Sequence, residues 1–175
     1  MKKIIKSLYS KIKKIIRIDK SSDEVKKLAI GKLITKKNKL KKIEKIEDIE
    51  FKIFSQFGDD GIIQFIIDKL EIDYEFQNFI EFGVEDYSEA NTKFLLLNNN
   101  WSGLILDSSN ENIESIKKSN FFWKFELEAI KCFIKKENIN SIITNSNIYK
   151  KKIGILSIDI DGNDYWVWKE INVID

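Results

Sequence analysis

The stretch FIEFGVEDYSEANTKFLLLNNNWSGLILD, residues 79–107, decides the fold of this chain. It opens within one short apolar run, residues 78–83, and closes on another, residues 103–107; both have the composition of strands buried on two faces. Between them, residues 88–100 have the apolar spacing of a helix, which we expect Ser88 to cap and the Asn98–Asn100 run to end. Strand, helix and strand joined by short links predict a parallel pair of strands.

The same alternation continues on both sides of this stretch. It predicts a helix after Asp59-Asp60-Gly61, then a helix over 110–119, a strand over 125–133, a helix over 137–145 and a fourth strand over 153–159. This order predicts an α/β domain over residues 48–175, in which helices cover both faces of a parallel sheet.

Acidic side chains follow three of the four expected strands. They are Glu81, Glu85 and Asp86 near the end of the first strand, Asp107 at the end of the second, and Asp159 and Asp161 after the fourth. A single acid at a strand end is often only a helix cap. Because ligands of open parallel sheets bind beyond the carboxyl ends of the strands, three such ends together favour a crevice for a cationic ligand that also carries hydroxyl groups.

Several other chemistries fit the sequence poorly. The stretch DIDGNDYWVWKE, residues 159–170, resembles a calcium loop, but a strand precedes it and Asp164 stands where such a loop needs glycine. A weak magnesium site at Asp159, Asp161 and Asn163 remains as an alternative. The chain has no phosphate-binding Gly-Lys-Ser/Thr loop and no histidine, which excludes histidine-based triads and histidine-ligated zinc. Its one cysteine, Cys132, allows no intrachain disulfide and fits the cytoplasm.

The first part of the chain differs sharply in charge from the rest. Residues 1–45 carry 17 Lys and Arg against 4 acids, whereas the remainder carries 13 Lys against 24 acids. We therefore expect a basic helical extension over residues 1–47. Its first 18 residues have an apolar stripe beside basic residues, so residues 1–20 are expected either to lie peripherally on the inner face of the membrane or to pack on the domain. Little aromatic interleaving and no binding motif speak against nucleic acid.

A second helix is expected to begin near Ser21-Ser22-Asp23, with Gly31 as its weak point. The stretch from Lys36 to Lys45 is expected to be a solvated face or a linker. No apolar run in the chain reaches the ~18 residues that a membrane-spanning helix needs.

Three segments together resemble a known enzyme family. FSQFGDDGI, residues 54–62, the stretch over residues 79–107 and LSIDIDGND, residues 156–164, resemble the FkbM-type family of S-adenosylmethionine-dependent methyltransferases in order and spacing. The resemblance implies a Rossmann-like methyltransferase fold with S-adenosyl-L-methionine as methyl donor. It also implies O-methylation of a sugar or another small hydroxyl compound.

Carried over position by position, the resemblance assigns the site residues. The cofactor-binding residues would be Gln56, Asp60, Glu81, Gly83, Glu85 and Asp107, and the catalytic residues Asp159 and Asp161. Asp107 would accept hydrogen bonds from the ribose hydroxyls, and Gly83 would let the backbone approach the donor closely. No metal is expected in this mechanism.

The chain departs from the family pattern at several places. Tyr87 stands where a later glycine is expected, so it would either narrow the donor site or stack on the adenine, and Asn100 replaces another glycine. Trp166 and Trp168 are expected to cover the sheet, with stacking on a sugar as the alternative. The sheet is expected to be incomplete after its fourth strand, which would leave an apolar edge. The alternative function is therefore an inactive, truncated fragment that binds a partner or a membrane.

Overall fold

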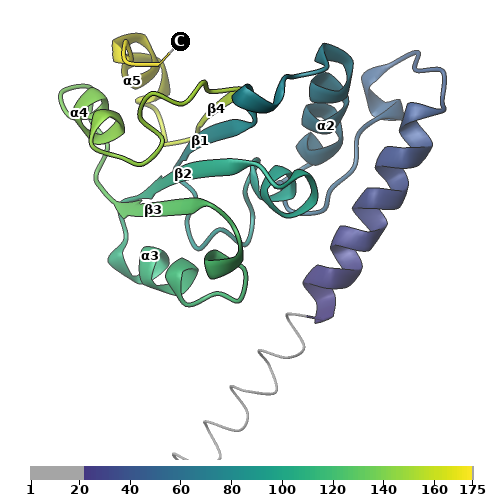
Figure 1. Cartoon of the computed structure of the whole chain (residues 1–175), viewed down its shortest axis with the longest axis horizontal. Coiled ribbons are helices and arrows are strands. Elements are labelled where there is room, and N and C mark those ends of the chain that lie inside the picture. The colour runs from purple at the N-terminus through teal and green to yellow at the C-terminus, as the bar shows by residue number, and fades with distance from the viewer. Residues whose placement is uncertain (1–21, 175) are drawn as a thin grey trace, which may run out of the picture.

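The computed structural model describes residues 22–174 of the chain, and its centre is a four-stranded sheet (Figure 1). The strands are β1 (Asn78–Phe82), β2 (Ser102–Asp107), β3 (Leu127–Lys131) and β4 (Ile155–Ile158). They lie in the order β3-β2-β1-β4, and every pair is parallel. The predicted parallel α/β fold is confirmed, and β4 is an edge strand as expected. β3 is two residues shorter at each end than the predicted strand over 125–133, and a 3-10 turn, Phe122–Lys124, precedes it.

Apolar side chains cover both faces of this sheet, as predicted. Because successive side chains of a strand point to opposite faces, Phe79 of β1 joins one core cluster while Ile80 and Phe82 join the other. The first cluster includes residues of α2 (Asp59–Leu70) and α3 (Asn110–Lys117). The second includes residues of α4 (Ile139–Thr144) and α5 (Asp164–Glu170), which lie across the sheet from α3 in Figure 1.

The helix between β1 and β2 begins later than predicted. The cap at Ser88 is wrong: helical residues start at Lys93 and lead into a π-helical turn, η3 (Leu95–Asn99). The backbone N–H groups of Asn91 and Thr92 instead donate to the carboxylate of Glu81 on β1, at 2.8 and 3.1 Å. The turn ends at Asn100, whose φ of 58° is left-handed. Asparagine adopts this conformation more readily than other residues with a side chain, which explains how it stands in for glycine.

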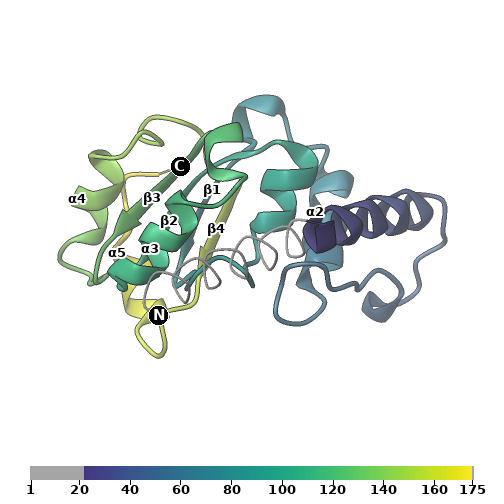
Figure 2. The same cartoon turned by 90° about the horizontal axis from the view of Figure 1, so that it is seen from below.

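The described part of the basic extension is a helix over residues 22–39, here called the N-terminal helix, followed by a loop and the short 3-10 helix η1 (Ile46–Asp48). Figure 2 shows it beside α2, at the opposite end of the molecule from α4. Leu28 and Ile34 pack on a third apolar cluster formed by Phe51, Ile53, Phe54 and Phe94. The predicted boundary at residues 47 and 48 therefore separates two segments that are in contact, and residues 1–20, with the expected membrane contact, lie outside the described residues.

An ion pair between the buried Lys93 and the partly exposed Glu24 fastens the N-terminal helix to the body. The Lys93 ammonium lies 2.8 Å from the Glu24 carboxylate, and the Lys93 side chain is only 3% exposed. Its Nζ also lies 4.8 Å from the ring centre of Phe54 and 5.2 Å from that of Phe121, distances at which a cation is attracted to an aromatic face. Glu24 is thus the acid that balances a charge buried among aromatic rings.

Gly31 is a close-packing position of the N-terminal helix and not its weak point. A Cβ atom at Gly31 would lie 2.5 Å from Cε2 of Phe94 and 3.0 Å from Cγ1 of Ile53. Since a methyl group does not fit at these distances, the absence of a side chain lets the helix approach the body.

We expect Gly31→Ala to lower the free energy of unfolding by about 1 kcal/mol, although alanine favours helix formation by a similar amount. Overpacking against Phe94 outweighs the gain in helix propensity. Urea denaturation measures the difference, with Lys32→Ala at the next, exposed position as the control. A stabilised Gly31→Ala variant would contradict the close packing.

The helix that follows β4 presents its large rings to solvent. Trp166 and Trp168 are each 58% exposed, and Val167 is the buried residue of α5. The expectation that the two tryptophans cover the sheet is therefore wrong, because they flank Val167 in the helix and only Val167 faces the core. None of the helices among the described residues is long and apolar enough to cross a bilayer.

Candidate functional site

A crevice of about 710 Å³ lies beyond the carboxyl ends of the strands. Loops after all four strands contribute to it, together with the segment before α2. Its volume falls within the range of sites that hold a cofactor-sized molecule, ~300–1,000 Å³. The residues that line it are Gln56, Gly83, Glu85, Leu106, Asp107, Ser108, Ser109, Asn112, Cys132, Phe133, Ile134, Asp159, Ile160, Asp161 and Asn163.

The crevice brings together six of the eight site residues predicted from the sequence. They are Gln56, Gly83, Glu85, Asp107, Asp159 and Asp161. The shared position follows from the parallel sheet, in which all strand ends point to one edge. The individual roles of these residues remain predictions.

Asp107 is a buried carboxylate with capacity for one more donor. Its Oδ2 accepts from the backbone N–H of Glu85 at 2.9 Å, and its Oδ1 accepts from the Ser109 N–H at 2.7 Å and the Asn112 amide at 3.1 Å. A carboxylate has roughly four acceptor positions, so these three bonds leave about one for a ligand hydroxyl. The same bonds hold the loops after β1 and β2 in place around the crevice.

Three further carboxylates of the crevice have no donor among the described residues. Glu85, Asp159 and Asp161 are exposed, and no lysine or arginine lines the crevice beside them. Glu85 and Asp161 also have left-handed backbones, with φ of 49° and 55°. Non-glycine residues in this conformation are strained, and such strain is common in loops that shape binding sites. The crevice is therefore strongly acidic and suited to a cationic ligand.

Gly83 lies where the chain segments that leave the neighbouring strands β1 and β4 pass close to each other. Its φ is 75°, and a Cβ atom there would collide with the carbonyl oxygen of Asp159. Glycine is thus required because the chain leaving β1 passes directly against the chain leaving β4. This close approach brings Asp159 near the loop that carries Glu85.

Glu81 does not line the crevice, which corrects its predicted place in the donor site. Besides the two N–H groups of Asn91 and Thr92, its carboxylate accepts from the Thr92 hydroxyl at 2.5 Å and from the Ser157 hydroxyl at 3.4 Å. All of its roughly four acceptor positions are thus occupied. Burial raises the pKa of Glu81, and the bonds from Thr92 and Asn91 offset part of that rise. Glu81 caps the turn that leads into η3.

Asp60 is also outside the crevice and shapes the segment beside it. Its Oδ2 accepts from the N–H groups of Ile53, Phe54 and Ser55 at 2.7, 2.7 and 2.8 Å and from the Ser55 hydroxyl at 2.9 Å. This cradle bends the chain just before Gln56, which does line the crevice. The predicted contact between Asp60 and the donor is therefore not supported, because Asp60 is buried and does not line the crevice.

Tyr87 lies in the core, so neither of its expected roles in the donor site holds. It is fully buried, its ring centre is 6.0 Å from that of Phe121, and its hydroxyl is 2.9 Å from the hydroxyl of Thr92. Burial raises the pKa of the phenol well above its ordinary value, and the nearby Glu81 carboxylate adds to the rise. The φ of 61° at Tyr87 turns the ring inward, away from the crevice.

Sequence reasoning missed the contribution of the third strand. Cys132, Phe133 and Ile134 follow β3 and line the crevice, as does Asn112 of α3. The rule applied to the other strand ends would have found the first three, because a parallel strand delivers its following residues to the same edge. Burial raises the pKa of the half-buried Cys132 thiol. Within residues 22–174, no three His, Cys, Asp or Glu side chains are grouped so that they could hold a metal ion.

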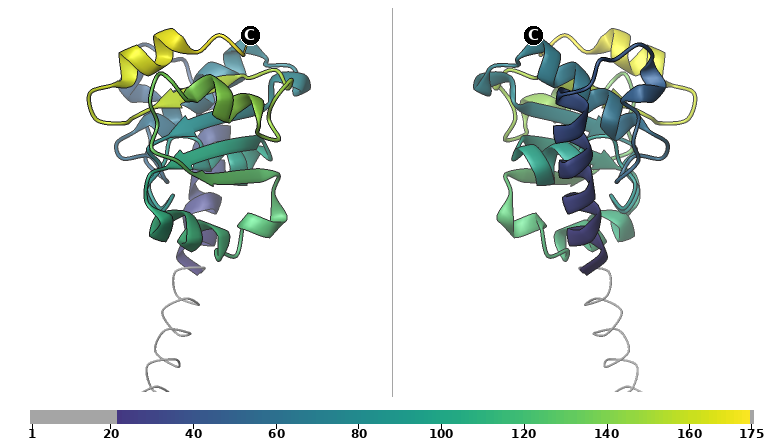
Figure 3. Two further views of the ribbon diagram at one scale, coloured as in Figure 1. Left: turned by 90° about the vertical axis from the view of Figure 1, so that its left-hand side faces the viewer. Right: turned by 90° about the vertical axis from the view of Figure 1, so that its right-hand side faces the viewer.

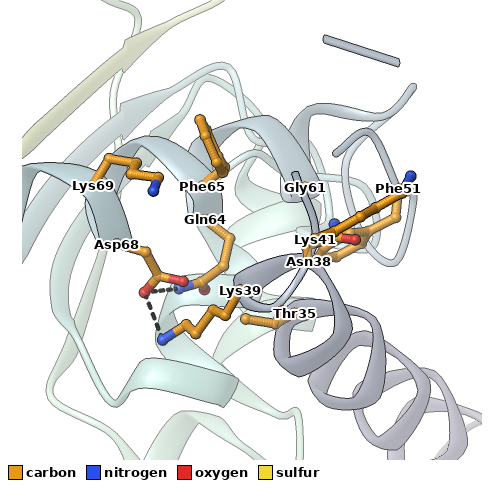
Figure 4. A pocket seen from close by; sticks show the side chains of 10 residues that line it. All are labelled: Thr35, Asn38, Lys39, Lys41, Phe51, Gly61, Gln64, Phe65, Asp68 and Lys69. Carbon is orange, nitrogen blue, oxygen red and sulfur yellow. Dashed lines mark hydrogen bonds and ion pairs between the residues drawn. The ribbon is translucent and has the colours of Figure 1, made fainter. Parts of the chain in front are cut away.

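A smaller cavity of about 140 Å³ lies between the N-terminal helix and α2 (Figure 4). Lys39 of the helix and Gln64 of α2 meet there at the carboxylate of Asp68, at 3.1 and 3.2 Å (Figure 4). These groups satisfy one another and tie the helix to α2. The larger crevice is therefore the candidate functional site.

Comparisons with protein-family models, with characterised proteins and with solved structures find no match to this chain.

Proposed function

We propose that this protein binds S-adenosyl-L-methionine in the acidic crevice and transfers its methyl group to a hydroxyl of a sugar or another small acceptor. The observation that carries the proposal is the set of four carboxylates, Glu85, Asp107, Asp159 and Asp161, around one crevice without a balancing cation. An adenosyl compound with an ammonium and a sulfonium suits such a set, and its ribose offers hydroxyl donors. The three sequence segments that resemble the methyltransferase family support the same assignment.

Different residues of the crevice bind different parts of the donor. Asp107, with about one acceptor position left, receives a ribose hydroxyl. Glu85 faces the positive charges, and Gln56 and Asn112 offer amide groups to the polar parts of the ligand. Bound in this way, the donor supplies an activated methyl group. The chain's main contribution is then to hold the two reactants in line, an effect worth several kcal/mol of barrier, about 7 or more in favourable cases.

The proton of the acceptor hydroxyl needs a base at the same edge of the sheet. The chain has no histidine and no lysine lines the crevice, so we assign this role to a carboxylate. Asp159 and Asp161 follow β4, line the crevice and have no donor among the described residues, which leaves both free to take the hydroxyl's hydrogen bond and then its proton. In this scheme they are the catalytic residues.

We expect Asp107→Ala to weaken the binding of S-adenosyl-L-methionine at least about tenfold, because a buried, charge-assisted hydrogen bond to the ribose is lost. Isothermal titration calorimetry measures the affinity. Asp73→Ala, which removes an exposed acid far from the crevice, is the charge-matched control. Undiminished affinity of Asp107→Ala, or equal losses in both variants, would reject the role of Asp107.

The single cysteine gives an independent report on the same crevice. Because Cys132 lines it and is the chain's one thiol, a bound donor should slow alkylation of the protein by N-ethylmaleimide. At the same donor concentration, Asp107→Ala should be protected less than the unsubstituted protein, because it binds the donor more weakly. An alkylation rate that S-adenosyl-L-methionine leaves unchanged in the unsubstituted protein would place its binding elsewhere.

A further inference from the structure

The N-terminal helix has a second apolar stripe that faces away from the body. Its inner side packs through Leu28, Gly31 and Ile34, whereas Val25, Ala29 and Leu33 follow one another at intervals of four residues on the outer side. Val25 is 66% exposed and Leu33 is 67% exposed. In the right-hand view of Figure 3 the helix lies in front of the body, which agrees with the exposure of Val25 and Leu33.

Basic side chains flank this outer stripe, and none of them is neutralised. Lys26, Lys32, Lys36 and Lys37 are exposed and make no ion pair within residues 22–174. The two acids of the helix are engaged elsewhere, since Asp23 pairs with Lys27 and Glu24 turns inward to Lys93. We call this set of residues the outer face: Val25, Lys26, Ala29, Lys32, Leu33, Lys36 and Lys37.

From this arrangement we infer that the outer face docks on an anionic lipid surface. A basic helix with an exposed apolar stripe lies in the interface of such a membrane, with the stripe among the acyl chains and the lysines at the headgroups. The positive charge alone would also suit a nucleic acid. The exposed apolar side chains of Val25 and Leu33, however, gain nothing from contact with a charged phosphate backbone. The inner contacts hold the helix on the body, so docking would anchor the whole domain.

This docking surface is independent of the chemistry in the crevice. The outer face shares no residue with the crevice lining, and the ion pair of Glu24 with Lys93 fixes the helix without using the outer lysines. The basic, apolar pattern of residues 1–18 in the sequence is of the same kind.

Co-sedimentation of the full chain with phosphatidylcholine vesicles containing about 30% phosphatidylserine, at ~0.1 M salt, tests the inference. Changing Lys26, Lys32, Lys36 and Lys37 together to Gln should weaken binding at least about tenfold, because each lysine contributes near an anionic surface. The matched control changes Lys117, Lys124, Lys131 and Lys136 to Gln, which alters net charge equally on other exposed positions. Val25→Ser with Leu33→Ser should weaken binding severalfold at unchanged charge.

Each other outcome overturns the inference. Equal losses for the two lysine sets would show that net charge and not the outer face decides binding. Full vesicle binding by the Val25→Ser, Leu33→Ser variant, with tighter binding of the protein to duplex DNA, would assign the lysines to nucleic acid. A dimer in sedimentation velocity that the serine substitutions dissociate would make the outer face an interface between two copies.

Discussion

Replacing Glu81 with alanine is expected to lower the free energy of unfolding by about 4 kcal/mol, the largest effect of any substitution proposed for this chain. The carboxylate is 4% exposed and accepts from the N–H groups of Asn91 and Thr92 and from the Thr92 hydroxyl. Alanine would leave these donors buried without partners, each at a cost of about 1–3 kcal/mol. Urea denaturation followed by tryptophan fluorescence measures the loss.

A matched control comes from the loop between β1 and η3, whose end Glu81 caps. Glu89→Ala removes an exposed carboxylate that is 3.2 Å from Lys52, and a surface pair of this kind contributes less than about 1 kcal/mol. A similar loss of stability in both variants would contradict the capping role of Glu81.

The pH dependence of the free energy of unfolding separates the effect of the Glu81 charge from the effect of the size and shape of its side chain. Burial raises its folded-state pKa above the ordinary value of 4.5. The stabilisation linked to its protonation is therefore complete below about pH 4.5 and is lost as pH rises through the raised pKa. Glu81→Gln cannot titrate, so the stability difference between the unsubstituted protein and this variant should shrink as pH rises from 4.5. A difference that is constant over this range would mean that Glu81 titrates normally.

The second large effect is expected at the ion pair that fastens the N-terminal helix. Glu24→Ala should lower the free energy of unfolding by about 3 kcal/mol, because it leaves the buried Lys93 ammonium without a counter-charge. Asp23→Ala, at the neighbouring position, breaks only an exposed pair with Lys27 at 3.4 Å and should cost less than about 1 kcal/mol. Chemical denaturation of both variants gives the comparison.

A double substitution tests whether the loss comes from the unpaired charge. Lys93→Met keeps the length of the side chain among the Phe54 and Phe121 rings but removes the ammonium. Added to Glu24→Ala, it should restore most of the lost stability, since it removes the buried charge that Glu24→Ala leaves unpaired. If the double variant is less stable than Glu24→Ala alone, the ammonium is held chiefly by the aromatic rings.

The periodicity of the sequence was sufficient to predict the sheet but not every side chain near its edge. Buried runs such as Ile80–Phe82 and Leu104–Leu106 indicate parallel strands, and their common direction places Asp107 and Asp159 at one crevice. Glu81 was misplaced because its partners, Asn91 and Thr92, are set by where the following helix begins. Side-chain periodicity does not locate such a start.

Close contacts between segments far apart in the sequence explain the other differences. Gly31 lowers helix propensity, but its effect on stability depends on close packing against Phe94, which is distant in the sequence. Tyr87 was expected at the donor site, yet its backbone is left-handed and its ring packs in the core beside Phe121. The orientation of α5, which exposes Trp166 and Trp168, depends likewise on which residue reaches the core.

The position of β1 between β2 and β4 has a consequence for synthesis on the ribosome. β2 follows β1 closely along the chain, but β4, the partner on the other side, is made only after α3, β3 and α4. Until Ile155–Ile158 leave the exit tunnel, one side of the most buried strand carries unpaired amide and carbonyl groups. A nascent chain at that stage would be prone to aggregate and a natural client for chaperones.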